Sequence, residues 1–467
     1  MKTPIWDFIR GYADADPLRL HMPGHKGTGP LGCERYDITE VAGADALYEA
    51  RGIIAQSEEN ASRLFGSGRT LYSTEGSSQC IRAMVYLAAA AFRKRSVCTG
   101  KPVMVAARNA HRAFLHACAL NDVDVVWLWP QAEAPLISCP VAPAQLEHTL
   151  SSLQASCCGV YVTSPDYLGW CQDIGALAQV CHRYGVPLLV DNAHGAYLHF
   201  LSEPLHPLDL GADLCCDSAH KTLPALTGGA YLHISAYASA AFAPHAKDAM
   251  ALFGSTSPSY LTLASLDLCN AYLADEIHDD LKAALPALSD ARDELTAAGL
   301  LRDSFSGRGC YSPLHLSISG DGAAFAGMLR GAGMEPEYAG PDALVLLFSP
   351  KDAEKAAGKA AAVLRDAAAA APELTQLRGN TEKAADGSAV TAVFSKMPRP
   401  EQAMRVREAV FSDYEEISAA DAAGRVAAMP TAFCPPAVPP VMPGERITPE
   451  AVRVLAYYGY DTVCVVC

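Results

Sequence analysis

The sequence predicts an α/β fold in which helices cover both faces of a mostly parallel sheet, followed by a smaller C-terminal α/β domain. Half of the 467 residues are hydrophobic and 19% are charged, which is enough apolar material for a large core. Between about residues 60 and 235, short apolar runs alternate with longer helical segments. After about residue 280, alanine-rich helical segments flank two strand-like runs. Apolar strands separated by helices are typical of parallel sheets buried on both faces.

The expected elements follow in chain order. Strands are expected at 103–106, 123–129, 160–163, 187–191, 212–216, 312–319 and 343–348. Helices are expected at 79–93, 110–120, 174–184, 262–273, 280–298 and 353–371. We expect four parts: an N-terminal arm (1–29), a large domain (30–280), a small α/β domain (281–395) and a C-terminal domain (396–467).

Charge and composition exclude several classes of protein. The 36 Lys and Arg against 51 Asp and Glu give a net charge of −15, which disfavours binding to nucleic acid. No run approaches the roughly 20 apolar residues of a membrane helix, and residues 1–16 lack the apolar centre of a signal peptide. Of the 16 cysteines, only Cys464 and Cys467 form a Cys-x-x-Cys, without the second half of a zinc site. We expect a cytoplasmic protein without a metal.

Two polar segments follow predicted strands, where α/β sheets bind their ligands. Lys221, beside Ser218 and His220, suits a Schiff base with a phosphate-bearing partner, although such a segment alone also fits an exposed loop. Asp191 ends a wholly apolar strand. It could pair with a protonated pyridine nitrogen or be an ordinary turn residue.

Two further segments complete the set. Gly76, Ser77 and Ser78 precede a long helix, where free N–H groups can bind a phosphate, although either serine could simply cap the helix. His111 could lie flat against a planar ring or cap the next helix. It is the occurrence of all four segments in one chain that points to a cofactor site.

Together these residues resemble the major domain of the bacterial Orn/Lys/Arg decarboxylases, which are fold-type-I pyridoxal-phosphate enzymes with the aspartate-aminotransferase fold. The similar motifs occupy residues 21–27 (His-Met-Pro-Gly-His-Lys-Gly), 37–40, 108–111, 163–169, 190–195, 218–224 and 255–260. Near the C-terminus, residues 435–439 and 443–445 resemble the closing domain of the family. The resemblance covers most of the chain, is strongest in the first 260 residues, and fits the short form of the family.

The resemblance implies a role for each matching residue. Lys221 would form the internal aldimine with pyridoxal phosphate, Asp191 would keep the pyridine nitrogen protonated, and His111 would stack on the ring. His194 would lie near the 3′ oxygen of the cofactor. The residues that would hold the phosphate are Gly76, Ser77, Ser78, Ser218 and His220, of which His220 would also take part in catalysis.

The resemblance also implies an assembly. Thr256 and Ser257 match a segment that reaches the cofactor phosphate of the partner subunit, so we expect a homodimer or a higher even-numbered oligomer with shared sites. Read from the residues alone, the segment is a polar turn with Ser257 or Ser259 as the cap of the next helix.

The implied reaction is decarboxylation of arginine, lysine or ornithine, with arginine favoured. A carboxylate must bind the distal cation of such a substrate, and the candidates are Glu40, Asp45, Glu75, Asp166 and Glu445. Three positions depart from the family pattern. They are Asn192 in place of a glutamate, Glu75 in place of an asparagine, and Thr227-Gly228-Gly229 in place of a segment with a glutamine.

Two alternatives stay open. An aminotransferase or a side-chain lyase would use the same cofactor for a different reaction. A catalytically decayed relative that regulates an active enzyme is the other, although the intact Lys221, Asp191 and His111 argue against it.

Overall fold

The computed structural model describes residues 1–95, 100–130, 138–153, 156–301, 310–375, 399–431 and 438–467. Residues 376–398 of the expected small and C-terminal domains, and residues 435–437 of the motif at 435–439, lie outside these ranges. Within the described part of the chain, no helix is long and apolar enough to cross a membrane.

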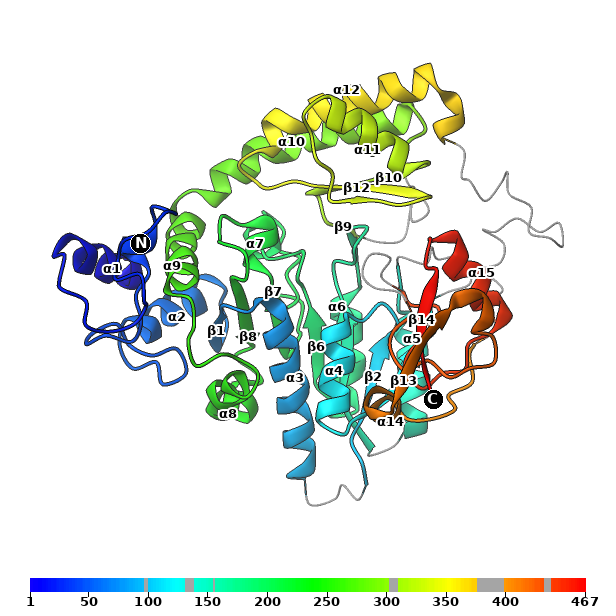
Figure 1. The fold of residues 1–467 in the computed structure, drawn as a ribbon, viewed down its shortest axis with the longest axis horizontal. Coiled ribbons are helices and arrows are strands. Elements are labelled where there is room, and N and C mark those ends of the chain that lie inside the picture. The colour runs from blue at the N-terminus through cyan, green and yellow to red at the C-terminus, as the bar shows by residue number, and fades with distance from the viewer. Residues whose placement is uncertain (96–99, 131–137, 154–155, 302–309, 376–398, 432–437) are drawn as a thin grey trace.

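A seven-stranded sheet forms the centre of the molecule (Figure 1), with the strand order β1-β8-β7-β6-β4-β2-β3. Its strands are β1 (Arg69–Ser73), β2 (Val103–Ala107), β3 (Asp124–Leu128), β4 (Cys157–Thr163), β6 (Leu188–Asp191), β7 (Leu214–Asp217) and β8 (Ala230–Ile234). The strands β3, β2, β4, β6 and β7 are parallel, whereas β8 runs antiparallel to both of its neighbours. The predicted mostly parallel sheet is confirmed.

Both faces of the sheet are buried. Met104 and Ala106 of β2 pack into one core with helices α3 (Gly76–Arg93), α4 (Arg112–Leu120) and α8 (Ser239–Ala251). Val105 and Ala107 pack into another core with α5 (Pro143–Leu153) and α6 (Ile174–Arg183). Alternate residues of a strand point to opposite faces, so burial on both sides explains the continuous apolar runs in the sequence.

A third core lies between the N-terminal helices and the small domain. Helices α1 (Pro4–Asp14) and α2 (Ile53–Leu64) pack against α9 (Tyr260–Asp275), which lies beside them in Figure 1. Ile5, Ile9 and Ala13 of α1 are buried because a spacing of four places them on one face of the helix. The same apolar cluster continues into the small domain.

The small domain contains a three-stranded antiparallel sheet, β10 (His315–Ser319), β12 (Ala343–Leu347) and β11 (Tyr338–Ala339). Its helices are α10 (Ile277–Ala297), α11 (Gly322–Gly331) and α12 (Ala353–Ala370), and α10 packs along α12 (Figure 1). Two short strands connect this domain to the large one, because β9 (Cys310–Tyr311) pairs with β5 (Trp170–Cys171).

The C-terminal residues form a small unit beside the edge of the large sheet. Strands β13 (Tyr414–Ser418) and β14 (Thr462–Val466) are antiparallel, and helices α14 (Val406–Phe411) and α15 (Pro449–Tyr457) accompany them. Helix α14 packs on α4. The remaining short helices are Glu34–Tyr36, Leu198–Phe200, α7 (Ala219–Thr222), Pro372–Thr375 and Ala419–Asp421.

Candidate active site

A cavity of about 190 Å³ lies at the carboxyl ends of the parallel strands. This is the place where open α/β sheets bind ligands. Its lining comes from segments far apart in the sequence: Gly76, Ser77, Ser78, Asn109, His111, Thr163, Pro165, Tyr167, Asp191, Ala193, His194, Ser218, His220 and Lys221. The structure thus brings the four segments singled out in the sequence together around one cavity.

Lys221 lies on the short helix α7, directly after strand β7. Its Nζ is 2.8 Å from Nε2 of His194. Next to it, the Ser218 hydroxyl donates to the Ser77 hydroxyl at 2.9 Å, which joins the lysine segment to the start of α3. The primary amine therefore faces the cavity while its own segment is held in place by hydrogen bonds.

Asp191 is the last residue of β6 and is 3% exposed. Its Oδ2 accepts from the Tyr161 hydroxyl at 3.0 Å, and its Oδ1 accepts from the backbone N–H of Ala193 at 3.2 Å. Burial, together with the negative charge of Asp191, raises the pKa of Tyr161, so this phenol stays a donor. The arrangement holds a buried carboxylate at the wall of the cavity, ready to pair with a cationic group.

Helix α3 begins at the cavity. Gly76 has φ +70°, a left-handed conformation that glycine adopts without strain, and its N–H donates to the carbonyl of Gly228 at 2.8 Å. A side chain at Gly228 would meet the Thr74 carbonyl at 2.7 Å, which explains a glycine there. The helix has Glu75 as its N-cap residue, without a side-chain cap, so neither Ser77 nor Ser78 is the cap that the alternative reading expected. Apart from that of Gly76, the N–H groups of the first turn, which include those of Ser77 and Ser78, can bind an anion.

His111 caps the next helix, one of the two roles considered for it, and it also lies at the cavity. It is the N-cap of α4, because its Nδ1 accepts from the N–H of Ala113 at 3.1 Å, and its ring also lines the cavity. Burial lowers the pKa of His111, although Asp191 acts in the opposite direction. A neutral ring that accepts at Nδ1 carries its proton on Nε2.

A chain of hydrogen bonds runs from Lys221 into the small domain. His194 Nδ1 lies 3.2 Å from Nε2 of His315, and His315 Nδ1 lies 2.7 Å from the Ser312 hydroxyl. Burial, with the nearby charge of Lys221, lowers the pKa of His194 and takes that of His315 to about 3, so both rings are neutral. The Lys221 ammonium therefore donates to His194, which donates to His315, which donates to Ser312.

Replacing His315 with alanine should leave the Nδ1–H of buried His194 without its acceptor. An unpaired buried donor costs about 1–3 kcal/mol, so we expect turnover to fall by between about fivefold and a hundredfold. His315→Gln offers a new acceptor and should recover part of the loss. Steady-state assays of both variants, with melting curves to verify folding, test this. Equal activity of the two variants would contradict a role in orienting His194.

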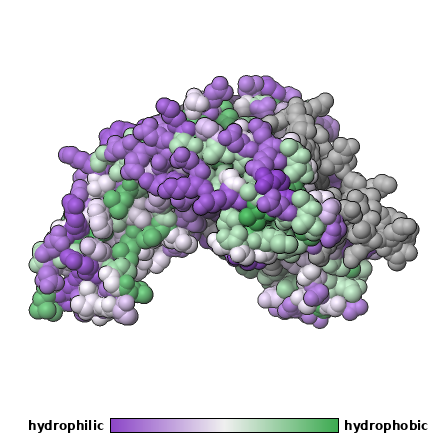
Figure 2. All heavy atoms as spheres, turned by 90° about the horizontal axis from the view of Figure 1, so that it is seen from above, coloured by the Kyte–Doolittle hydropathy of each residue, from purple (hydrophilic) through white to green (hydrophobic). Residues whose placement is uncertain are grey.

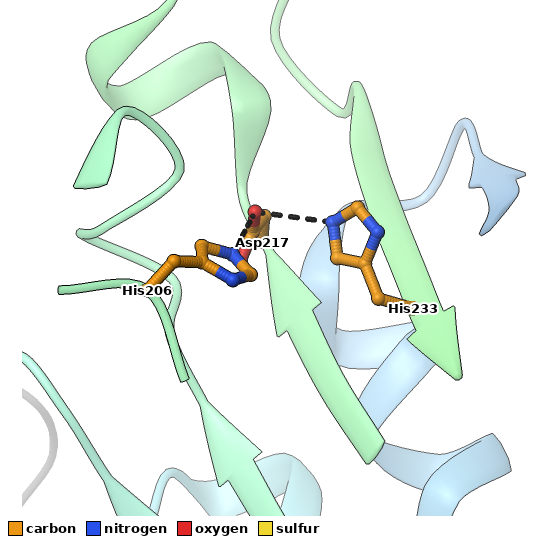
Figure 3. A group of neighbouring side chains, drawn as sticks. All are labelled: His206, Asp217 and His233. Carbon is orange, nitrogen blue, oxygen red and sulfur yellow. Dashed lines mark hydrogen bonds and ion pairs between the residues drawn. The ribbon is translucent and has the colours of Figure 1, made fainter. Parts of the chain in front are cut away.

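Behind the lysine segment lies a buried group of three side chains that the sequence analysis did not single out (Figure 3). Asp217 Oδ2 accepts from Nε2 of His206 at 3.0 Å and from Nε2 of His233 at 3.1 Å, and all three side chains are fully buried. Burial alone would raise the pKa of Asp217, but the two histidines hold it well below its usual range. The three residues come from separate loops and strands, so no motif in the sequence predicts that they lie together.

The ligand atoms of this group lie within 4.8 Å of one another, yet the hydrogen bonds already satisfy them. The N–H of Leu208 donates to His206 Nδ1, and the Thr70 hydroxyl lies 2.8 Å from His233 Nδ1, so each ring can donate its Nε2–H to Asp217 while neutral. The group anchors the end of β7, immediately before Ser218. It therefore positions the lysine segment.

Asn192 completes this network. Its amide Nδ2 donates to Asp217 Oδ1 at 2.7 Å in a fully buried position. A glutamate here would set a second carboxylate against Asp217 in the interior, where like charges strongly destabilise each other. The departure from the family pattern at Asn192 is thus matched to its buried neighbour.

Three of the five carboxylates proposed for the distal cation, Asp45, Asp166 and Glu445, each accept two or more hydrogen bonds within the protein. Asp45 accepts from five backbone N–H groups, at distances from 2.7 to 3.4 Å, which hold the start of α2. Asp166 is fully buried and accepts from the Ser138 hydroxyl and from the N–H groups of Leu168 and Trp170. Burial raises the pKa of Asp166 to about 7. These bonds argue against both residues as substrate ligands.

Glu445 is bound to Arg108 by two contacts of 2.6 Å, and both side chains are almost completely buried. Glu40 and Glu75 are exposed, and Glu75 accepts from the N–H of Ser255. Among the described residues that line the cavity, none of the five candidates appears. Along the chain, Asp166 lies between the lining residues Pro165 and Tyr167, and Glu75 lies next to the lining residue Gly76.

Replacing Glu445 with glutamine should destabilise the fold, because the buried Arg108 guanidinium would keep its charge without a carboxylate. Breaking such a pair costs about 3–5 kcal/mol. Denaturant unfolding measures the effect. Glu401→Gln is the matched control, since Glu401 pairs with Arg446 at the surface and such pairs contribute about 0–1 kcal/mol. A loss no larger than that of the control would contradict this account of the pair.

Thr256 and Ser257 are exposed and do not line the cavity of their own chain. The cap of α9 is Ser259, whose hydroxyl accepts from the N–H of Thr262 at 3.3 Å. The contact between Ser255 and Glu75 fixes this turn near the start of α3.

Comparison with known proteins identifies the family of the chain. A sequence model of the Orn/Lys/Arg decarboxylase major domain matches residues 3–303, and one of the C-terminal domain of that family matches residues 387–461. An uncharacterized protein of Bacillus subtilis, YaaO, is 29% identical over 98% of this chain and 94% of its own. An arginine decarboxylase of B. subtilis is 26% identical over 96% of this chain and 92% of its own.

Comparison with solved structures also finds amino-acid decarboxylases. A lysine decarboxylase of Francisella novicida superposes with a TM-score of 0.77 over 100% of this chain and 81% of that chain, at 18% sequence identity. At 18% identity this match shows the fold alone, whereas the matches to the family models show the kind of enzyme. The chain therefore belongs to the Orn/Lys/Arg decarboxylase family, pyridoxal-phosphate enzymes that decarboxylate basic amino acids.

Proposed function

We propose that this chain decarboxylates arginine, using pyridoxal phosphate bound in the cavity around Lys221. The main support for this proposal is that Lys221, Asp191 and His111 line one cavity together with the start of α3. Arginine is favoured over lysine and ornithine because the arginine decarboxylase of B. subtilis matches nearly the whole chain.

The residues present fit the cofactor. The lysine Lys221 faces the cavity, a buried carboxylate lies at its wall, and hydroxyl and N–H groups are present at Ser77 and Ser218. These are the partners that an aldehyde, a pyridinium nitrogen and a phosphate require. The chemistry that bound pyridoxal phosphate supplies is an electron sink for the carbanion left when carbon dioxide departs.

Each side chain then has a distinct task. Asp191, held by Tyr161, would keep a proton on the pyridine nitrogen by direct charge pairing. Ser77, Ser78, Ser218 and His220 would hold the phosphate. His111 would cover the ring. Neutral His194 accepts from the Lys221 amine at Nε2, which orients that amine and leaves no second positive charge beside it.

A substrate screen tests the proposal. Holoenzyme is incubated with arginine, lysine or ornithine, and carbon dioxide, amine and keto acid are measured. We expect one carbon dioxide and one amine for each arginine consumed, faster than with lysine or ornithine. Preference for lysine or ornithine would overturn the choice of substrate. Keto acid without carbon dioxide would favour an aminotransferase, and a colourless protein that takes up no cofactor would favour a decayed relative.

We also propose that two chains share the active sites. Thr256 and Ser257 are exposed and do not line their own cavity, which suits a role toward another subunit. Figure 2 shows a concave edge with apolar side chains on the limb at its left, the end where the N-terminal residues lie in Figure 1. Leu18 and Leu20 of the N-terminal arm, and Leu31 just after it, are each more than 80% exposed. Such exposed apolar residues favour burial against a second copy.

Subunit mixing tests the shared site. A Lys221→Ala chain and a Thr256→Ala/Ser257→Ala chain are each expected to be impaired on their own. After exchange, a hybrid dimer contains one site with an intact Lys221, Thr256 and Ser257, so activity should rise above that of either parent. No rise, despite proven exchange, would place the two hydroxyls outside the partner's site.

A further inference from the structure

Two cysteines face each other where the small domain meets the large one. Strands β5 and β9 are antiparallel, and their register places Cys171 directly opposite Cys310. Both are present as free thiols. The pair is 139 residues apart in the sequence, so only the fold brings these side chains together.

The geometry of this pairing suits a disulfide. Residues directly opposite in antiparallel strands have Cα atoms about 4.5–5.5 Å apart, with both side chains on the same face. Disulfides form when the Cα atoms are about 4.4–6.8 Å apart. The N–H of Ser312 donates to the carbonyl of Gly169 at 2.7 Å, which extends the pairing by one residue and fixes the register.

The two thiols differ in access and acidity. Cys171 is 6% exposed, whereas Cys310 is partly open to solvent. A hydrogen bond from Cys171 lowers the pKa of Cys310 to about 7, so a substantial fraction of Cys310 is thiolate near neutral pH. In contrast, burial raises the pKa of Cys158 in the sheet. An accessible thiolate with a second thiol beside it is the arrangement found in redox-sensitive cysteine pairs.

We propose that Cys171 and Cys310 form a reversible disulfide, by exchange with a low-molecular-weight disulfide, and that this bond joins the small domain to the large one. Cys310 loses its proton to water and its sulfur attacks one sulfur of the reagent, whose S–S bond breaks and releases one thiolate. Cys171 then loses its proton and attacks the Cys310 sulfur, which releases the second thiolate. The two protein thiols are oxidised, and the reagent is reduced to two thiols that take up the two protons.

The position of the pair links it to the proposed active site. Ser312, two residues after Cys310, receives the hydrogen bond of His315 at the end of the chain from Lys221. Its hydroxyl also lies 2.6 Å from the Tyr197 hydroxyl of the large domain. The disulfide would therefore link β5 to β9, and both strands lie immediately beside the hydrogen bonds that run from Lys221 to Ser312.

The test uses the cofactor-loaded full chain and oxidised glutathione as the probe. After incubation, remaining thiols are alkylated under denaturing conditions, and the protein is digested without reduction and examined by mass spectrometry. We expect a peptide pair linked through Cys171 and Cys310, lacking two hydrogens relative to the free peptides and absent after treatment with a dithiol. The linked protein should also melt at a higher temperature than the reduced protein.

Three variants sharpen the result. Cys310→Ser and Cys171→Ser should each lose the linked peptide. Cys464→Ser is the matched control and should keep it, because Cys464 is also partly buried but lies opposite Glu416 rather than a cysteine. Recovery of both cysteines as alkylated thiols in the wild-type protein, although exposed Cys467 has reacted, would overturn the proposal. So would a stable mixed disulfide of glutathione on Cys310. The wild-type result decides the matter even if a variant fails to fold.

Discussion

Replacing Lys221 with alanine is expected to abolish decarboxylation while leaving the fold intact. Lys221 is partly exposed to the cavity, and its Nζ bonds to the His194 ring. Its removal deletes the only covalent attachment that the proposal assigns to the cofactor, so turnover should fall by about four powers of ten or more. Steady-state release of carbon dioxide measures the loss, and circular dichroism verifies the fold.

The absorbance of the cofactor gives a second reading for this variant. The band of lysine-bound pyridoxal phosphate should be missing in Lys221→Ala and present in Lys359→Ala, an exposed lysine on α12 that serves as the matched control. Activity of Lys221→Ala within about tenfold of wild type would show that this lysine has been given the wrong role.

Replacing Asp191 with asparagine should keep cofactor binding but lower turnover by about three powers of ten. The amide cannot hold a proton on the pyridine nitrogen by charge pairing, and a neutral ring is a much weaker electron sink. The substitution is nearly isosteric, and the backbone of Ala193 can still donate to the remaining oxygen. Rates at saturating substrate, with cofactor content measured in parallel, test this expectation.

Tyr161→Phe provides the graded comparison for Asp191. It removes one hydrogen bond, of 3.0 Å, to a carboxylate that keeps its charge, so the expected loss is about tenfold, which is close to the usual value of one bond to a charged group. Near-normal turnover of Asp191→Asn would mean that the nitrogen is held by another group. An equal loss in both variants would mean that the hydrogen bond matters more than the charge.

The sequence predicted the large sheet well because its strands carry a local signal. Continuous apolar runs identify β2, β4, β6 and β7 within a few residues, since burial on both faces leaves no polar alternation. Boundaries that depend on a tertiary contact were less accurate. Helix α3 begins at Gly76 rather than at residue 79, because the Gly76 N–H is bound by Gly228, which lies 152 residues later in the sequence.

Some residues of the active site could likewise be predicted from local sequence patterns, and others could not. The motifs at Lys221, Asp191, His111 and the start of α3 lie at strand ends and helix starts, which the pattern of elements indicates. His315, His206 and His233 have no local signal, because each gains its partner through a contact with a distant segment. The acidic residues illustrate the limit most clearly. Whether Glu445 is free to bind a substrate depends on Arg108, 337 residues away.

The central claim is that Lys221 carries the cofactor of a basic amino-acid decarboxylase. Borohydride reduction of the cofactor-loaded protein, followed by digestion and mass spectrometry, tests this claim most directly. The prediction is loss of the yellow colour and a single pyridoxyl-modified peptide that contains Lys221. Modification of a different lysine, or of none in a protein that retains activity, would contradict it.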